Sequence, residues 1–432
     1  MSPDYPKAIM TDLFTPLTLP CGAVLPNRIC KAAMEENLAE QPGQLPGPAL
    51  HNLYRNWAAG GAGLILTGNV MVDPTAMTGP GGVVLQRSTF DDAQAKLCFK
   101  RWAQAGTSGA GKFVMQISHP GRQVYSSLYD SGLGTPAVAP SDTQVEIKGL
   151  KGMFAAARAL TAAEIDTLVT RFADTAAAAQ ACGFDGVQIH AAHGYLVSQF
   201  LSLLVNKRED EYGGNLENRA RFLMKIIDAV RAKTRADFIV GVKLNSSDFQ
   251  RGGFDTDDAR AVVAMLNHKA VDFIEFSGGS YESAAMAGHS ADGRVTRSME
   301  RELYFAEFVE DLARAAKPAI MVTGGVTRRE TANYALSIKG VDMVGIARAM
   351  AANPDIPLDW RAGENLTTSI PLSRLKHPAF NSLVGMSMTK AQMRAASQNK
   401  SVPLSPNGFM ATLKGQIEKA KQTKRYKAWR GD

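Results

Sequence analysis

Short apolar segments recur along the chain, and most of them are followed by a stretch with helical, amphipathic spacing. The segments are near-continuous runs of Val, Ile, Leu, Phe and Met, a pattern typical of parallel strands that are buried on both faces. Eight such segments cover residues 28–33, 63–67, 112–117, 186–190, 238–244, 272–276, 319–323 and 342–346. The stretches between them predict helices over residues 91–105, 161–182, 217–234, 256–268, 299–316 and 328–338. This alternation predicts a protein of the α/β class.

Eight strand–helix units favour a (β/α)8 TIM barrel over an open doubly wound sheet. The barrel would occupy residues 11–355, and the long link over residues 118–160 is a candidate lid or pocket wall. The chain has no Gly-x-Gly-x-x-Gly motif, which weakens a Rossmann interpretation further. Residues 360–432 are predicted to form a C-terminal, mainly helical basic extension, with a helix over residues 408–428.

Composition and charge narrow the classes of protein to consider. Of the 432 residues, 45% are hydrophobic and 21% charged, and no apolar run approaches the ~18 residues that span a membrane. The chain begins without the apolar stretch of a secretory signal, and its four cysteines form no Cys-x-x-Cys motif. We therefore expect a reduced, cytoplasmic protein without a metal centre or membrane partner.

The basic charge is concentrated at one end of the chain. Residues 373–432 hold twelve basic and two acidic residues, a net charge of +10, so residues 1–372 carry −3 of the total of +7. A basic protein invites a nucleic-acid interpretation, but here the body of the chain is mildly acidic. We expect the extension to be a solvated helix, and a nucleic-acid partner is not favoured.

The residues after the fourth predicted strand include the most closely spaced set of candidate catalytic side chains. His190, His193 and Tyr195 fall within six residues, at the carboxyl end of a strand, where barrel enzymes place their active sites. One alternative is that the histidines are hydrogen-bonded core residues. Another is a metal site, for which a third ligand is missing. We consider Tyr195, His190 and His193 candidate catalytic residues.

The loops after strands seven and eight indicate a phosphate-bearing ligand. Small residues after strand seven (Gly324 and Gly325) would let backbone N–H groups approach an anion, and Ala347 and Arg348 follow strand eight. The alternative is a pair of simple tight turns. Lys243 stands inside an apolar run and would be costly to bury without an anionic partner. Gln116, near the end of strand three, is either a site residue or a satisfied core amide.

These residues form part of a longer pattern. Residues 189–196 read Ile-His-Ala-Ala-His-Gly-Tyr-Leu, and Phe-Leu-Ser (200–202), Arg-Glu-Asp-Glu-Tyr-Gly-Gly (208–214) and Glu-Asn-Arg (217–219) follow. Leu-Phe-Thr-Pro at 13–16 and Gly-Ala-Gly-Leu-Ile at 61–65 precede them. Over roughly residues 11–355 the chain resembles the old yellow enzyme family of FMN-dependent NADH:flavin oxidoreductases and ene-reductases.

The resemblance implies a non-covalent FMN, NADH or NADPH as the hydride donor and a small enone-type substrate, and it is compatible with a homo-oligomer. Gln116 and Lys243 would contact the flavin ring. The ring would be lined by Ala32, Ala33, Met34 and Asn69, with Glu35 beside them. The phosphate would be held by Gly324, Gly325, Ala347 and Arg348. His190 and His193 would bind the substrate's carbonyl oxygen, and Tyr195 would donate a proton.

The chain departs from the family pattern at two of these positions. Lys243 stands where the family usually has arginine, and Glu35 stands where relatives commonly have cysteine or threonine. A lysine lacks the planar fork of arginine, so the flavin potential is expected to differ. A carboxylate at position 35 either disfavours the reduced, anionic flavin or points elsewhere.

Two other kinds of protein remain as alternatives. An FMN-dependent RNA-modifying enzyme, similar to a tRNA-dihydrouridine synthase, would account for the basic extension, although that family uses a cysteine acid. A non-redox, phosphate-binding barrel, such as an aldolase, would use Lys243 as a Schiff-base amine.

Overall fold

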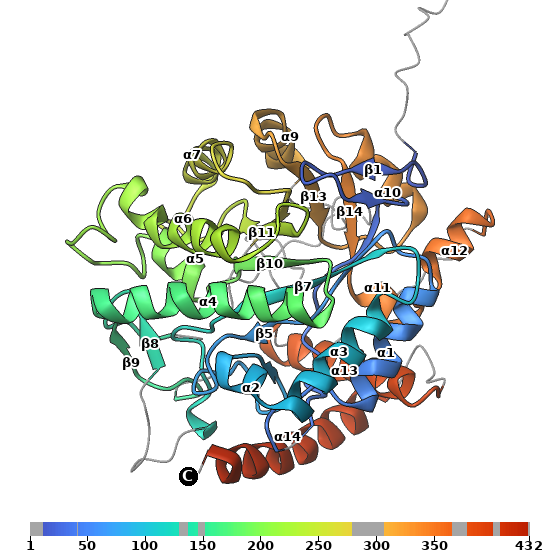
Figure 1. The fold of residues 1–432 in the computed structure, drawn as a ribbon, viewed down its shortest axis with the longest axis horizontal. Coiled ribbons are helices and arrows are strands. Elements are labelled where there is room, and N and C mark those ends of the chain that lie inside the picture. Colours follow the sequence, from blue (N-terminus) through green and yellow to red (C-terminus); the bar gives the residue numbers. More distant parts are fainter. Residues whose placement is uncertain are drawn as a thin grey trace, which may run out of the picture.

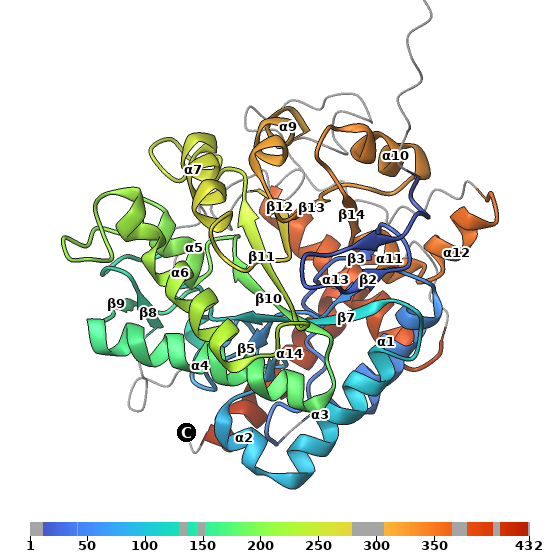
Figure 2. The ribbon, with the colours of Figure 1, turned by 45° about the horizontal axis from the view of Figure 1, so that its top comes forward.

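A closed parallel barrel forms the centre of the computed structural model, which describes residues 12–40, 42–128, 137–145, 152–278, 306–364, 378–400 and 407–430. Neighbouring barrel strands are joined in the order β10-β11-β12-β13-β14-β3-β4-β7, and β7 pairs with β10 to close the ring (Figure 2). The strands are β3 (Ile29–Lys31), β4 (Leu64–Leu66), β7 (Lys112–Ser118), β10 (Gly186–Ala191), β11 (Ile239–Asn245), β12 (Phe273–Ser277), β13 (Ala319–Thr323) and β14 (Met343–Ile346). Each overlaps one predicted segment, so the predicted TIM barrel is confirmed.

Helices surround the barrel (Figure 1). They are α1 (Pro48–Ala59), α3 (Ala93–Gly106), α4 (Ala162–Cys182), α6 (Leu216–Lys233), α7 (Thr256–Leu266), α9 (Ala306–Ala315), α10 (Arg329–Ser337) and α11 (Arg348–Ala352). Helix α4 begins with a capping box, in which Thr161 accepts from the Glu164 amide and Glu164 accepts from the Thr161 amide. The first part of the helix predicted over 299–316 lies outside the described residues. Helix α1 was missing from the predicted set.

Shorter elements connect and cover the barrel. A hairpin of β1 (Leu17–Thr18) and β2 (Val24–Leu25) packs Leu25 against the barrel interior. Strands β5 (Val70–Met71) and β6 (Val83–Val84) extend the sheet beyond β7. The link after β7 contains η1 (Ser126–Leu128), β8 (Ala137–Ala139) and β9 (Ala157–Ala159). The remaining short helices are α2 (Arg87–Asp91), α5 (Leu196–Leu201) and α12 (Ile356–Arg361).

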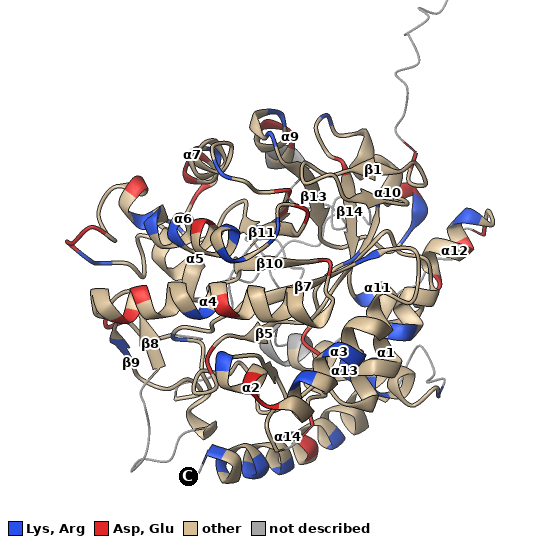
Figure 3. Ribbon diagram, in the orientation of Figure 1, with Lys and Arg blue, Asp and Glu red and all other residues tan. Residues whose placement is uncertain are grey.

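The C-terminal part of the chain forms two longer helices, α13 (Pro378–Ser397) and α14 (Gly408–Arg430). Helix α14 contains the predicted basic helix, and Figure 3 shows the lysines and arginines along it. Helix α13 was not predicted; it packs against α1, α11 and α14. Helix α14 also contacts the loop between β5 and β6, because the Tyr426 hydroxyl donates to the Pro74 carbonyl (2.8 Å). None of the helices in the described part of the chain is long and apolar enough to cross a membrane.

Candidate active site

Three ring side chains converge at the carboxyl end of β10. The ring centroids of His190 and His193 lie 5.2 Å apart, and those of His190 and Tyr195 lie 4.6 Å apart, edge to face. The chain can bring them together because His193 and Gly194 both adopt a left-handed backbone (φ +60° and +73°), which turns it sharply after the strand. A histidine in this region is uncommon and marks a position where the surroundings enforce the conformation.

Both histidines are neutral at physiological pH. Burial lowers the pKa of each imidazole well below its usual value, and the Lys243 ammonium adds to this effect. His190 Nδ1 accepts a hydrogen bond from the Ala192 amide (3.3 Å), so the proton of its neutral ring lies on Nε2. His190 therefore has an N–H donor that this local bond does not use.

The position of His193 is fixed from three neighbouring segments. Its amide donates to Asn245 Oδ1 (3.2 Å), and its carbonyl accepts from Gln123 Nε2 (2.9 Å). Its Nε2 lies 2.8 Å from Ser277 Oγ, at the end of β12. When the serine hydroxyl donates to Nε2, the ring proton lies on Nδ1, which then becomes the donor.

Lys243 and Gln116 belong to one buried polar network. Lys243 Nζ lies 2.8 Å from Glu275 Oε1, and Gln188 Nε2 donates to Glu275 Oε2 (2.7 Å). Gln116 Nε2 in turn donates to Gln188 Oε1 (2.7 Å). Glu275 and Gln188 were absent from the predicted site. Each of them is a polar residue inside an apolar strand segment, and the same feature identified Lys243 as a candidate.

A second buried network joins the loops that follow β3 and β4. Lys31 Nζ donates to the Leu66 carbonyl (2.8 Å) and lies 4.1 Å from the centroid of the Trp57 ring on α1. Burial lowers the pKa of Lys31 to about 8, although Glu36 acts in the opposite direction. The Tyr54 hydroxyl donates to Glu36 Oε1, which also accepts from the Gly68 amide (3.1 Å). This network connects the segment with Met34 to the segment with Asn69.

Several predicted ligand-binding positions lie at these strand ends and fit a polar cofactor. The side-chain oxygens of Asn69 (Oδ1) and Thr323 (Oγ1) are buried without a hydrogen-bond partner in the described part of the chain. Buried polar atoms of this kind need a partner, and a bound polar molecule supplies one. Gly325 has φ +69°, a left-handed conformation that favours glycine, in the loop after β13. Ala32 is buried, and Arg348 opens α11 directly after β14 and Ala347.

Glu35 interacts with the C-terminal part of the chain. The Thr78 hydroxyl donates to Glu35 Oε1, and Lys390 Nζ on α13 lies 3.5 Å from Glu35 Oε2. Burial by itself would raise the pKa of the Glu35 carboxyl, but Lys390 and the Thr78 hydrogen bond outweigh it, and the pKa lies below its usual value. The carboxylate is therefore charged and compensated. Its ion pair with the extension was not predicted.

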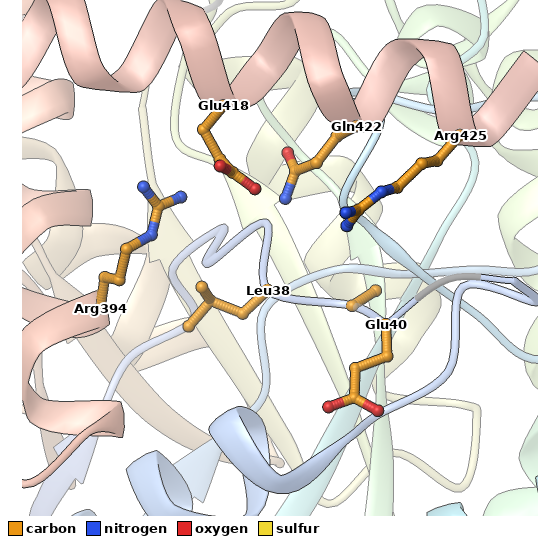
Figure 4. A pocket seen from close by; sticks show the side chains of 7 residues that line it. Leu38, Glu40, Arg394, Glu418, Gln422 and Arg425 are labelled. Atoms are coloured by element: carbon orange, nitrogen blue, oxygen red, sulfur yellow. The ribbon is translucent and has the colours of Figure 1, made fainter.

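Two clefts lie away from the three rings. One of about 250 Å³ separates α14 from the loop after β3, and Figure 4 shows Glu418, Gln422 and Arg425 extending from α14 toward Leu38 and Glu40. The other, of about 560 Å³, includes Arg231 and Asp272. Asp272 immediately precedes β12, so this cleft opens at the amino ends of the strands, opposite the histidines. In the described residues, no group of three His, Cys, Asp or Glu side chains is placed to hold a metal ion.

Comparison with known proteins gives a consistent result. Residues 12–367 match the model of the NADH:flavin oxidoreductase / NADH oxidase family. The NADH-dependent flavin oxidoreductase iliE of Hypocrea jecorina is 36% identical over 351 residues, which cover 79% of this chain and 87% of that protein. Its namesake from Neonectria sp. is also 36% identical, over 81% of this chain; there the chain spans about half the relative's length (47%). The solved structure of an old yellow enzyme homologue from Zymomonas mobilis has a TM-score of 0.67 at 26% identity, covering 82% of this chain and 94% of that one.

A parallel barrel with two neutral imidazoles and a phenol at one strand end, matched over most of its length by flavoenzymes, defines a flavin-dependent oxidoreductase. The chain belongs to the NADH:flavin oxidoreductase / NADH oxidase family, of the old yellow enzyme type. The cofactors of this family are FMN and a nicotinamide dinucleotide. The predicted family, fold, enzyme class and cofactors are thereby confirmed, whereas the roles of individual residues stay predictions.

Proposed function

We propose that the protein reduces a carbon–carbon double bond conjugated to a carbonyl group in a small molecule, with NADH or NADPH as the reductant. The observation that carries the proposal is the edge-to-face set of His190, His193 and Tyr195, with both imidazoles neutral. The set combines hydrogen-bond donors with a phenol, and the reduction of an enone needs both.

The imidazoles stabilise the oxygen on which charge develops. When a nucleophile adds to the β-carbon of an enone, negative charge moves to the carbonyl oxygen. Nε2–H of His190 and Nδ1–H of His193 serve as its donors. By analogy with oxyanion holes, each donor contributes about 3–4 kcal/mol to the transition state.

Tyr195 completes the reaction as a general acid. Bound FMN supplies the hydride that adds to the β-carbon. Tyr195 then gives its hydroxyl proton to the α-carbon, and its phenolate regains a proton from solvent. The product has gained one hydride and one proton, so the charge balances.

The remaining predicted residues hold the cofactor in this proposal. Gln116 and Lys243 contact the flavin ring, and Ala32, Ala33, Met34 and Asn69 line it. Gly324, Gly325, Ala347 and Arg348 hold the phosphate. The Lys243–Glu275 ion pair (2.8 Å) argues against an aldolase, because a Schiff-base lysine must be an uncharged amine and a paired ammonium is not nucleophilic.

The test is an anaerobic visible spectrum of the purified holoprotein. NADH or NADPH should bleach the flavin band, and 2-cyclohexenone should restore it. A band that bleaches but does not return with the enone would reject alkene reduction and retain the flavin assignment. If 2-cyclohexenone restores the band equally fast in a variant that lacks both imidazoles, the proposed role of the histidines is wrong.

A further inference from the structure

The C-terminal helices bring two lysines to the rim of the candidate active site. Lys390 belongs to α13 and Lys419 to α14, both beyond residue 367, where the match to the family model ends. Lys390 pairs with Glu35 (3.5 Å), and Lys419 Nζ lies 3.7 Å from the centroid of the Tyr125 ring. These four side chains, Glu35, Tyr125, Lys390 and Lys419, are called the rim cluster below.

The rim cluster carries an excess positive charge. Glu35 is the single carboxylate among the four, and Lys390 compensates it at ion-pair distance. No described carboxylate lies within ion-pair distance of Lys419, whose neighbour is the face of an aromatic ring. Burial and the Lys390 ammonium lower the pKa of Lys419, and the Glu35 carboxylate only partly offsets them. A partly buried ammonium beside a second ammonium is unfavourable by itself, and an added anion would relieve this.

The rim cluster is connected to the histidines through one short segment. Tyr125 lies two residues after Gln123, whose amide donates to the His193 carbonyl (2.9 Å). Tyr125 stacks on Phe154 with ring centroids 5.3 Å apart, which fixes the ring beneath the Lys419 amine. Burial, followed by the Glu35 carboxylate, raises the pKa of Tyr125 to about 12, so its phenol stays neutral and adds no negative charge.

We propose that Lys419 binds an anionic oxygen group, a carboxylate, on the molecule that is reduced at this site, while Lys390 keeps Glu35 from repelling it. The inference rests on the proposed function and adds a substrate class to it: unsaturated carbonyl compounds that carry an acid group. An anionic group of the nicotinamide dinucleotide has the same chemistry and is the second source to distinguish. The C-terminal extension is in this view a specificity element of the active site.

The experiment compares two acceptors that differ in one charge, 4-oxopent-2-enoate and its methyl ester. The kcat/KM of each is measured with Lys419→Met, Lys419→Arg and the wild-type holoprotein. We expect Lys419→Met to lower the acid-to-ester ratio of kcat/KM about tenfold, and Lys419→Arg to keep most of it, since a cation that binds a carboxylate contributes on this scale. Lys414→Met, an exposed lysine on the same helix, is the matched control and should leave the ratio unchanged.

Each outcome is informative. An unchanged ratio in Lys419→Met, in a protein with normal flavin content, overturns the inference even if both acceptors are reduced. If the ratio is unchanged but the Kd for NADH or NADPH in the reductive half-reaction rises about tenfold, Lys419 binds the dinucleotide and the carboxylate assignment is wrong. Failure of wild-type protein to reduce either acceptor or 2-cyclohexenone would refute the proposed function instead.

Discussion

Lys243 and Glu275 face each other on adjacent strands of the barrel, with 2.8 Å between Lys243 Nζ and Glu275 Oε1, and neither side chain is more than 4% exposed. The two residues are register partners on β11 and β12, so the pairing is built into the sheet. A buried ammonium without an anionic partner is unfavourable. Glu275 supplies this anionic partner at hydrogen-bond distance.

Breaking this ion pair should lower the stability of the protein and change the midpoint potential of the bound flavin. Glu275→Gln leaves a buried ammonium uncompensated, so we expect the free energy of unfolding to fall by about 3 kcal/mol. If Lys243 contacts the flavin ring, the midpoint potential of the bound flavin should also rise, because the uncompensated cation favours the reduced, anionic ring. Urea unfolding and a redox titration measure the two effects. Asp257→Asn removes an exposed partner of Arg260 and should change neither, whereas an unaltered potential in Glu275→Gln would place Lys243 away from the ring.

Tyr195→Phe should separate the two half-reactions. The variant lacks the proton donor, so we expect reoxidation of the flavin by 2-cyclohexenone to slow by about 10²–10⁴-fold. Flavin reduction by NADH or NADPH needs no proton from Tyr195 and should keep its rate. Stopped-flow spectra of each half-reaction provide the measurement, with Tyr334→Phe, a half-exposed tyrosine, as the control. Equal slowing of both half-reactions would mean that Tyr195 is not the acid.

His190 and His193 should make stability depend on pH. Their pKa values are lower in the folded protein than in the unfolded chain, where histidine titrates near 6.5. The unfolded chain therefore binds more protons than the folded protein below pH 6.5. The contribution of the neutral histidines to the free energy of unfolding is fully present above that pH and is lost as the pH falls. At pH 5.5 the loss is at most about 1.4 kcal/mol for each histidine, the limit for a ring that stays unprotonated in the folded protein. Urea unfolding at pH 7.5 and 5.5 should show a smaller difference in His190→Asn, and the same difference as wild type in a variant of the exposed His268.

Gly68→Ala should disturb the junction between the two loops that follow β3 and β4. A Cβ at this position would lie 2.1 Å from Glu36 Oε2 and 2.3 Å from the Met34 carbonyl oxygen. We expect a loss of at least 2 kcal/mol in the free energy of unfolding, about the cost of overpacking, and weaker flavin binding to the apoprotein. The control is Gly385→Ala in helix α13, where a Cβ meets nothing within 4 Å. This change should stabilise the protein by about 0.5–1 kcal/mol. An unchanged flavin affinity in Gly68→Ala would show that this loop junction does not support the cofactor site.

The barrel, and the grouping of three ring side chains after one strand, can be predicted from local sequence patterns. Continuous apolar segments mark strands buried on both faces, and their alternation with amphipathic stretches leaves few other topologies. His190, His193 and Tyr195 fall within six residues after one strand segment, so their common location follows from the sequence, whereas their ring contacts depend on the left-handed turn at His193 and Gly194. Helix α1 could also have been predicted, because Leu50, Leu53, Tyr54 and Trp57 have helical spacing. All four are buried in the structure.

Which charged side chains pair with one another depends on the packing of distant elements. Glu275 lies 32 residues after Lys243, and its role depends on strand register, which no local pattern encodes. Lys390 lies 355 residues after Glu35, and the two meet because α13 packs on α1 and α11. Local spacing predicts elements and motifs, since these depend on neighbours along the chain. The partner of a buried charge depends on how distant elements pack, and this packing brings the basic extension to the rim of the candidate active site.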